Sequence, residues 1–157
     1  RQVDRGPEVP QLLKWLERAG FPVAQDAARF SIFTWPQHWE ADRPLDRRVL
    51  KAAAADAARL AEEVEKRRPL LLFFVSAQLL DAANLPEVLE ALEPVLAHPA
   101  EPVRRITDLR LRVTAQRWVK ALCFGLPMPR KTFTPETEET IAAGIAAIFR
   151  REELLPG

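Results

Sequence analysis

The sequence predicts a mostly α-helical protein, a single-domain helical bundle of five or six helices with at most a minor β element around residues 30–35 and 109–114. Hydrophobic residues make up 48% and charged residues 29% of the 157 residues, the balance of a folded globular chain. Apolar residues recur at helical spacing in several segments, and fourteen prolines against five glycines indicate short, rigid connections. The length suits one domain over residues 1–157, and a chain that begins at Arg1 rather than Met is expected to be a fragment of a longer one.

The first part of the chain predicts one helix and one short strand. The helix covers residues 10–19 and stops at Gly20; its apolar residues are Leu12, Leu13, Trp15 and Leu16. Residues 30–35 are aromatic and β-branched and end before Pro36. This pattern favours a strand, with a buried loop as the alternative.

The strongest helix signal covers residues 42–68. Pro44 suits its first turn, Asp42 lies close to the N-cap, and Pro69 ends the element. The apolar stripe at helical spacing consists of Val49, Ala53, Leu60 and Val64. Residues 70–80 begin with an apolar run, which fits either a buried helix or a buried strand that runs into a helix.

Two further segments predict helices in the second half of the chain. Pro86 fits the first position of a helix that reaches about Ala97, and Pro94 would distort its third turn. Thr134 as N-cap and Pro135 at the first position open a terminal helix that ends near residue 151.

Residues 103–124 give a mixed signal. We favour one long helix, although its apolar face drifts around the axis. The alternative is a strand followed by a helix, because Leu109, Leu111 and Val113 alternate with polar residues.

Charge is concentrated in one segment although the net charge is only +1. Residues 104–131 carry eight basic side chains and one acidic one, a local charge of +7, whereas the segments on either side are each −3. Arginine predominates, and its guanidinium forms bidentate hydrogen bonds with phosphate or carboxylate. We therefore predict that this segment binds an anionic partner, unless acids elsewhere in the fold neutralise it. The candidate residues are Arg104, Arg105, Arg110, Arg112, Arg117, Lys120, Arg130 and Lys131.

A second candidate site is an aromatic cluster in residues 35–39. Trp35, His38 and Trp39 could form a platform on which a nucleic-acid base, a peptide or a flat ligand stacks. The alternative, which we favour, is a small core patch that covers the first helix near Trp15.

No catalytic or metal-binding motif is visible, so we expect neither a catalytic residue, a metal, a cofactor nor an enzymatic activity. The spacings CxxC, HxxxH and HExxH are missing, as are glycine-rich phosphate loops. A single cysteine, Cys123, excludes an internal disulfide and fits a small buried side chain in a reducing compartment, the cytoplasm or, in a eukaryote, the nucleus. No apolar run approaches the ~20 residues of a membrane span.

The sequence therefore supports a binding module, with nucleic acid as the favoured anionic partner. Two alternatives remain open. One is a helical protein–protein interaction or assembly module, which would expose an apolar patch. The other is a helical domain that binds a small ligand in an apolar pocket. The oligomeric state is not predicted.

Overall fold

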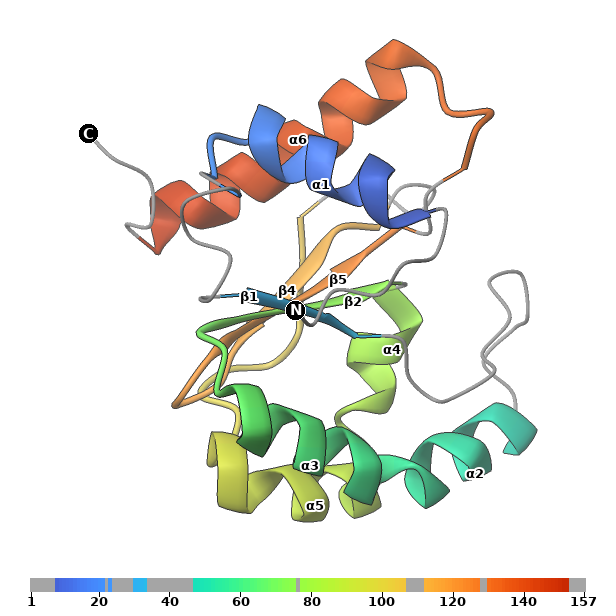
Figure 1. Ribbon diagram of the computed structural model, residues 1–157, viewed down its shortest axis with the longest axis vertical. Coiled ribbons are helices and arrows are strands. Elements are labelled where there is room, and N and C mark those ends of the chain that lie inside the picture. The colour runs from blue at the N-terminus through green and yellow to red at the C-terminus, as the bar shows by residue number, and fades with distance from the viewer. Residues whose placement is uncertain are drawn as a thin grey trace.

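The protein has a mixed β-sheet with helices on both faces (Figure 1), so the prediction of a helical bundle is wrong. The computed structural model describes residues 8–21, 23, 30–33, 47–75, 77–106, 112–127 and 130–152. Within them the sheet has five strands in the order β1-β2-β5-β4-β3, one of them only two residues long. The strands are β1 (Phe30–Phe33), β2 (Leu71–Val75), β3 (Arg104–Arg105), β4 (Thr114–Arg117) and β5 (Leu122–Leu126). The helices are α1 (Glu8–Arg18), α2 (Arg47–Ala55), α3 (Ala57–Arg67), α4 (Ala77–Ala82), α5 (Pro86–Leu96) and α6 (Pro135–Arg151).

The directions of the strands give the sheet two distinct edges. β1, β2 and β5 are parallel, with Phe73 opposite Phe124, whereas β4 runs antiparallel to β5 and β3 antiparallel to β4. We call the edge where β2 and β5 end, at Val75 and Leu126, the carboxyl edge; β4 begins there because Thr114 pairs with Gly125. The opposite edge, where β2 and β5 begin, is the amino edge.

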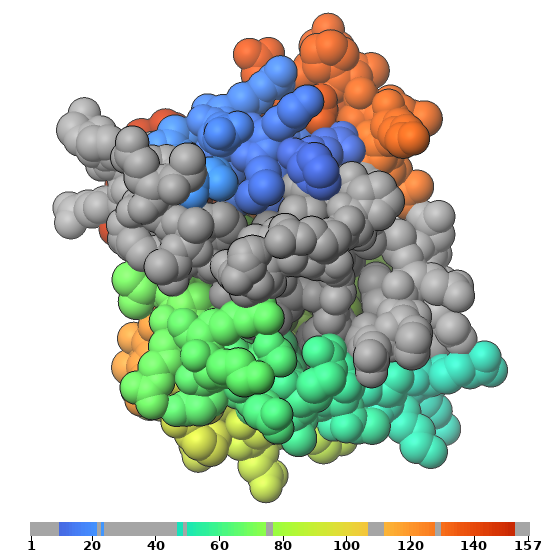
Figure 2. Space-filling model, viewed as in Figure 1, coloured from blue at the N-terminus to red at the C-terminus, as the bar shows by residue number. Residues whose placement is uncertain are grey.

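Each face of the sheet is buried under its own set of helices. α1 and α6 cover one face, where Phe124 stacks on Phe73 with ring centroids 4.9 Å apart and meets Phe149 of α6 edge-on at 5.4 Å. Helices α2 to α5 cover the other face, where Leu72 and Cys123 are buried. Figure 2 shows the two helical layers as separate parts of the surface, α1 and α6 above and α2 and α3 below.

The prediction of one long helix over residues 103–124 is wrong. This segment contains β3, β4 and most of β5, and the described part turns sharply between Trp118 and Ala121, whose backbone groups bond at 2.8 Å. The sequence did not reveal these strands because both of their faces are buried. β5 has the sequence Leu-Cys-Phe-Gly-Leu and β4 has Thr-Ala-Gln-Arg, and neither shows the polar–apolar alternation of a strand with one solvent-exposed face. The described residues therefore form an α/β fold, and the prediction of an all-α helical bundle is wrong.

Other elements follow the sequence more closely. Thr134 caps α6, since its hydroxyl accepts a hydrogen bond from the N–H of Thr137 at 3.1 Å, and Pro135 occupies the first turn. The apolar run from residue 70 is a strand that leads into a helix, as in the second of the two alternatives. The helix predicted over residues 42–68 is two helices, which meet at Asp56.

A buried amide pair ties β4 to the end of α4. Gln116 is 1% exposed, and its side chain exchanges two hydrogen bonds with the side chain of Asn84, at 2.9 and 2.8 Å. Its remaining groups bond to the indole of Trp118 and to the backbone carbonyl of Glu101. Because every polar atom of the Gln116 side chain has a partner, its burial costs little. The same hydrogen bonds fix the position of β4 relative to Asn84 and Glu101.

Candidate anion-binding site

The arginines of β3 and β4 divide between the two faces of the sheet. Strand alternation sends neighbouring side chains to opposite faces. Arg104 and Arg117 contact acids on the α6 side, whereas Arg112 contacts Asp81 of α4. The two pairs of arginines, Arg104 with Arg117 and Arg105 with Arg112, therefore have different surroundings.

Arg104 and Arg117 are held by carboxylates of the same fold. The Nε of Arg104 donates to Glu101 Oε1 at 3.0 Å, and the backbone N–H of Arg117 donates to Glu101 Oε2 at 2.8 Å. The guanidinium of Arg117 donates to Glu152 Oε1 through Nη2 at 2.7 Å and Nε at 3.1 Å. Arg151 adds a third cation 3.6 Å from Glu101. The alternative of internal neutralisation thus applies to these two arginines, which anchor the end of α6 to the sheet.

Arg105 and Arg112 lie at the carboxyl edge and are not held in this way. Among the described residues, the carboxylate paired with Arg112 is that of Asp81, with 3.9 Å between Nη1 and Oδ2, which is too long for a hydrogen bond. Within the described residues neither guanidinium donates a hydrogen bond to a protein group. Arg105 is exposed and Arg112 is partly exposed, so these donors face solvent.

Asp81 balances only part of this positive charge. Burial raises the pKa of its carboxyl, and the positive charges of Arg112 and Arg105 partly offset that rise. Asp81 lies 3.9 Å from Arg112, and the formal charges of the cluster of Asp81, Arg105 and Arg112 sum to +1. Guanidinium groups that make no hydrogen bond to the protein present the donors that an oxyanion such as phosphate accepts.

The other predicted residues are scattered. Lys120 is exposed in the turn between β4 and β5, at the amino edge and therefore away from this cluster. Arg130 and Lys131 are exposed after β5, where the backbone carbonyl of Arg130 accepts a hydrogen bond from Gln11 at 3.0 Å. Arg110 lies outside the described residues, as does the aromatic cluster of Trp35, His38 and Trp39.

Sequence reasoning missed the acids that decide which arginines are available. Asp81, Glu101 and Glu152 come from three separate parts of the chain, and only the sheet topology brings them to β3 and β4. No spacing in the sequence signals these pairings.

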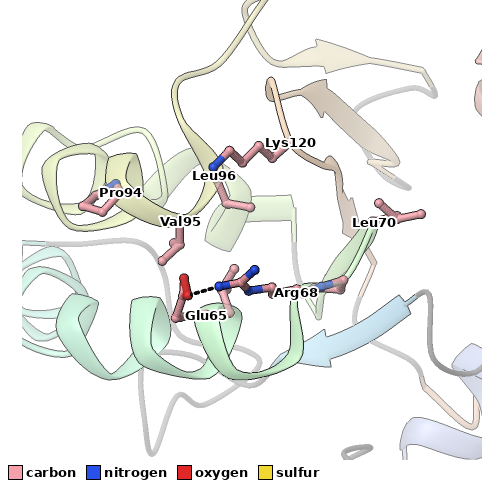
Figure 3. A pocket seen from close by; sticks show the side chains of 9 residues that line it. Glu65, Arg68, Leu70, Pro94, Val95, Leu96 and Lys120 are labelled. Carbon is pink, nitrogen blue, oxygen red and sulfur yellow. Dashed lines mark hydrogen bonds and ion pairs between the residues drawn. The ribbon is translucent and has the colours of Figure 1, made fainter.

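A half-open pocket of about 330 Å³ lies at the amino edge, between the C-terminal ends of α3 and α5. Figure 3 shows Lys120 on one side of it and Arg68, paired with Glu65, on the other. The pocket surface is slightly more polar than apolar; it is lined by Val64, Glu65, Arg68, Pro69, Leu70, Pro94, Val95, Leu96 and Lys120.

The described residues offer little for metal or thiol chemistry. Within them no three His, Cys, Asp or Glu side chains are grouped so that they could hold a metal ion. Cys123 is buried, and this burial raises the pKa of its thiol far above the usual range. No helix in the described ranges has the length and apolar character needed to cross a membrane.

Comparisons of the chain with protein-family models, with curated proteins and with solved structures give no match.

Proposed function

We propose that this protein binds an anionic partner at the carboxyl edge of its sheet and that the partner is a nucleic acid, held through its phosphates. The observation that carries the proposal is the difference between two pairs of arginines on or next to β3 and β4. Arg104 bonds to Glu101 through Nε and Arg117 bonds to Glu152 through Nε and Nη2, whereas Arg105 and Arg112 donate no hydrogen bond to a protein group within the described residues. The Nη2 of Arg104 is buried and has no partner there, so it is not available to a ligand either.

The place of this cluster supports the proposal. In open α/β sheets, ligands bind outside the carboxyl ends of the parallel strands, because the loops that leave the strands there are free to vary. β2 and β5 both end at this edge, and Arg112 stands just before the start of β4 beside them.

Arginine chemistry favours phosphate over other anions. A guanidinium presents a rigid fork of N–H groups that matches two phosphate oxygens, and its weak hydration lowers the cost of binding. Arg105 and Arg112 could bind neighbouring phosphates of one backbone, while exposed Arg130 and Lys131 at the exit of β5 add positive charge. Such contacts are independent of base sequence and depend strongly on salt. An intracellular location, cytoplasmic or nuclear, is part of this proposal, because nucleic acids are found there.

The test is binding of fluorescently labelled single-stranded and duplex oligonucleotides across a salt series. We expect the logarithm of the association constant to fall linearly with the logarithm of the salt concentration. The double variant Arg105→Glu with Arg112→Glu should reduce affinity by about tenfold or more and reduce the slope by about 2, roughly 1 for each phosphate contact. The matched pair of single variants is Arg112→Glu and its control Lys66→Glu, the same charge reversal at an exposed site near the end of α3, at the amino edge.

The proposal is lost if no binding is detected at low salt. It is equally lost if Lys66→Glu weakens binding as much as Arg112→Glu does, because net charge alone would then explain the affinity. A response to Arg117→Gln larger than that to Arg112→Gln would move the site to the α6 face and would also contradict it.

A further inference from the structure

Features that usually mark a functional surface meet at the amino edge, opposite the proposed nucleic-acid site. The first is backbone strain. Within the described residues, the non-glycine residues with positive φ are Arg68, at φ 45°, and Ala97, at φ 65°. Arg68 lines the pocket and Ala97 directly follows its Leu96. A left-handed backbone costs a non-glycine residue on the order of 1–2 kcal/mol, and glycine would avoid it. At Arg68 this conformation ends α3 in the left-handed cap that is common at helix C-termini, whereas Ala97 combines φ 65° with ψ −129°, so the strain lies mainly at Ala97.

The second feature is exposed apolar surface. Within the described part of the chain the large hydrophobic side chains classed as exposed are Leu70 and Val119, at 51% and 54%. Leu70 lines the pocket, and Val119 precedes Lys120 in the turn beside it. Leu70 thus borders a hollow of about 330 Å³ whose walls include Val95 and Leu96, and Val119 lies one residue from its lining residue Lys120.

The third feature is charge. Arg68 is paired with Glu65 at 2.7 Å, whereas Lys120 has no carboxylate within 4 Å in the part of the chain that the structure describes. The lining charges of Arg68, Lys120 and Glu65 therefore sum to +1. The C-terminal end of α5 offsets part of this, since α5 has no basic residue in its last turn and a helix end carries about half a negative charge.

From these features we infer that the amino-edge pocket binds a short peptide segment of a partner protein, one that carries an apolar side chain next to a carboxylate. The apolar side chain enters the pocket against Val95 and Leu96, and the carboxylate pairs with Lys120. The flanking peptide covers Leu70 and Val119. A small ligand fits the observations less well, because the pocket is open on one side and would leave Val119 uncovered. This inference does not depend on the nucleic-acid proposal, which concerns the other edge of the sheet.

The experiment titrates the ¹⁵N-labelled chain with the peptide acetyl-Glu-Leu-Leu-Glu-amide and follows backbone amide shifts. We expect weak, saturable binding with the largest shifts at Leu70, Leu96, Val119 and Lys120. Replacing the leucines of the peptide by serines should abolish the shifts. Lys120→Glu should weaken binding of the acidic peptide about fivefold, the scale of one exposed ion pair turned from attraction to repulsion. It should also strengthen binding of the matched basic peptide acetyl-Lys-Leu-Leu-Lys-amide.

Lys51→Glu is the control, since Lys51 is exposed on α2 and does not line the pocket. Lys120 is exposed, so the variant should fold, and the dispersion of its amide spectrum verifies this. The inference is overturned if the acidic and basic peptides bind the unaltered chain equally, if the shifts map outside the pocket, or if no shift occurs. Equal shifts with butyrate would identify a small carboxylate as the occupant and would also overturn it.

Discussion

Gly125 lies where α4 approaches the centre of the sheet most closely. A Cβ added at this position would stand 2.6 Å from Thr114 Oγ1, 2.8 Å from the Cα of Ala77 and 3.1 Å from the Cβ of Leu80. Two of these atoms belong to α4, and the Cα of Ala77 cannot move without moving the helix. We therefore predict that Gly125→Ala destabilises the fold strongly.

The expected loss of stability is the sum of two costs and one smaller gain. Overpacking a well-filled core costs about 1–3 kcal/mol, and a contact with backbone places this change at the upper end. Rotating Thr114 away would break its 3.3 Å hydrogen bond to the carbonyl of Gly125, worth about 1 kcal/mol. Alanine regains roughly 0.5–1 kcal/mol because it loses less backbone entropy than glycine. The expected net loss is about 3 kcal/mol.

Urea unfolding followed by tryptophan fluorescence measures this loss. With a slope of about 2 kcal/mol per molar urea, the midpoint should fall by about 1.5 M. Adding Thr114→Ala to Gly125→Ala should restore only part of the stability, because the contact with Ala77 remains. Ala77→Gly should restore none, since the contact is with its Cα. A midpoint unchanged or raised by Gly125→Ala would refute the close packing of α4 on β5.

Three further outcomes are expected. Hydrogen bonds from Trp15 and Gln11 lower the pKa of Glu138, so this group stabilises the fold above its unfolded pKa of about 4.3 and stops doing so as pH falls through its folded value. Thermal melts should therefore show Glu138→Gln less stable than the unaltered chain at pH 7, by a difference that shrinks as the pH falls below the unfolded pKa of the carboxyl; a difference that does not change with pH would contradict this. Ala97→Gly should raise stability by about 1 kcal/mol in urea unfolding, because relief of the strain at φ 65° exceeds the added unfolded-state entropy; a loss would show that this backbone is not strained. Cys123 should react with a thiol reagent only at the rate of unfolding, because it is buried and its pKa is raised; fast labelling of the folded protein would be inconsistent with its burial.

The sequence predicted the elements that carry local signals. The terminal helix has a capping threonine and a proline at its first position, and both act within a few residues of each other. The strand at Phe30–Phe33 has its own aromatic and β-branched composition. These signals do not depend on the rest of the chain.

The central strands could not be predicted from periodicity. β5 is buried on both faces, so Leu122 to Leu126 read as a continuous apolar run that also fits a buried helix. β4 contains Gln116, whose burial is possible only because Asn84 and the carbonyl of Glu101 satisfy its amide. Such a polar residue looks solvent-exposed until its partners are known.

The sequence shows the basic segment as a concentration of positive charge, but it does not show which of its arginines pair with acids of the same fold. Whether an arginine is free depends on acids that lie far away in the sequence: Glu152 is 35 residues from Arg117. Charge counting treats Arg104 and Arg105 as equivalent neighbours. Alternation along the strand sends one toward Glu101 and the other toward Asp81.

The most direct test of the account is the behaviour of the arginine side chains themselves when nucleic acid is added. The Nε–H signals of the ¹⁵N-labelled chain, recorded at slightly acidic pH, report each guanidinium separately. We predict that an oligonucleotide shifts the signals of Arg105 and Arg112 and leaves those of Arg104 and Arg117 in place, because Glu101 and Glu152 already hold the latter pair. Unchanged signals from Arg105 and Arg112, or shifts mainly at Arg104 and Arg117, would contradict the account.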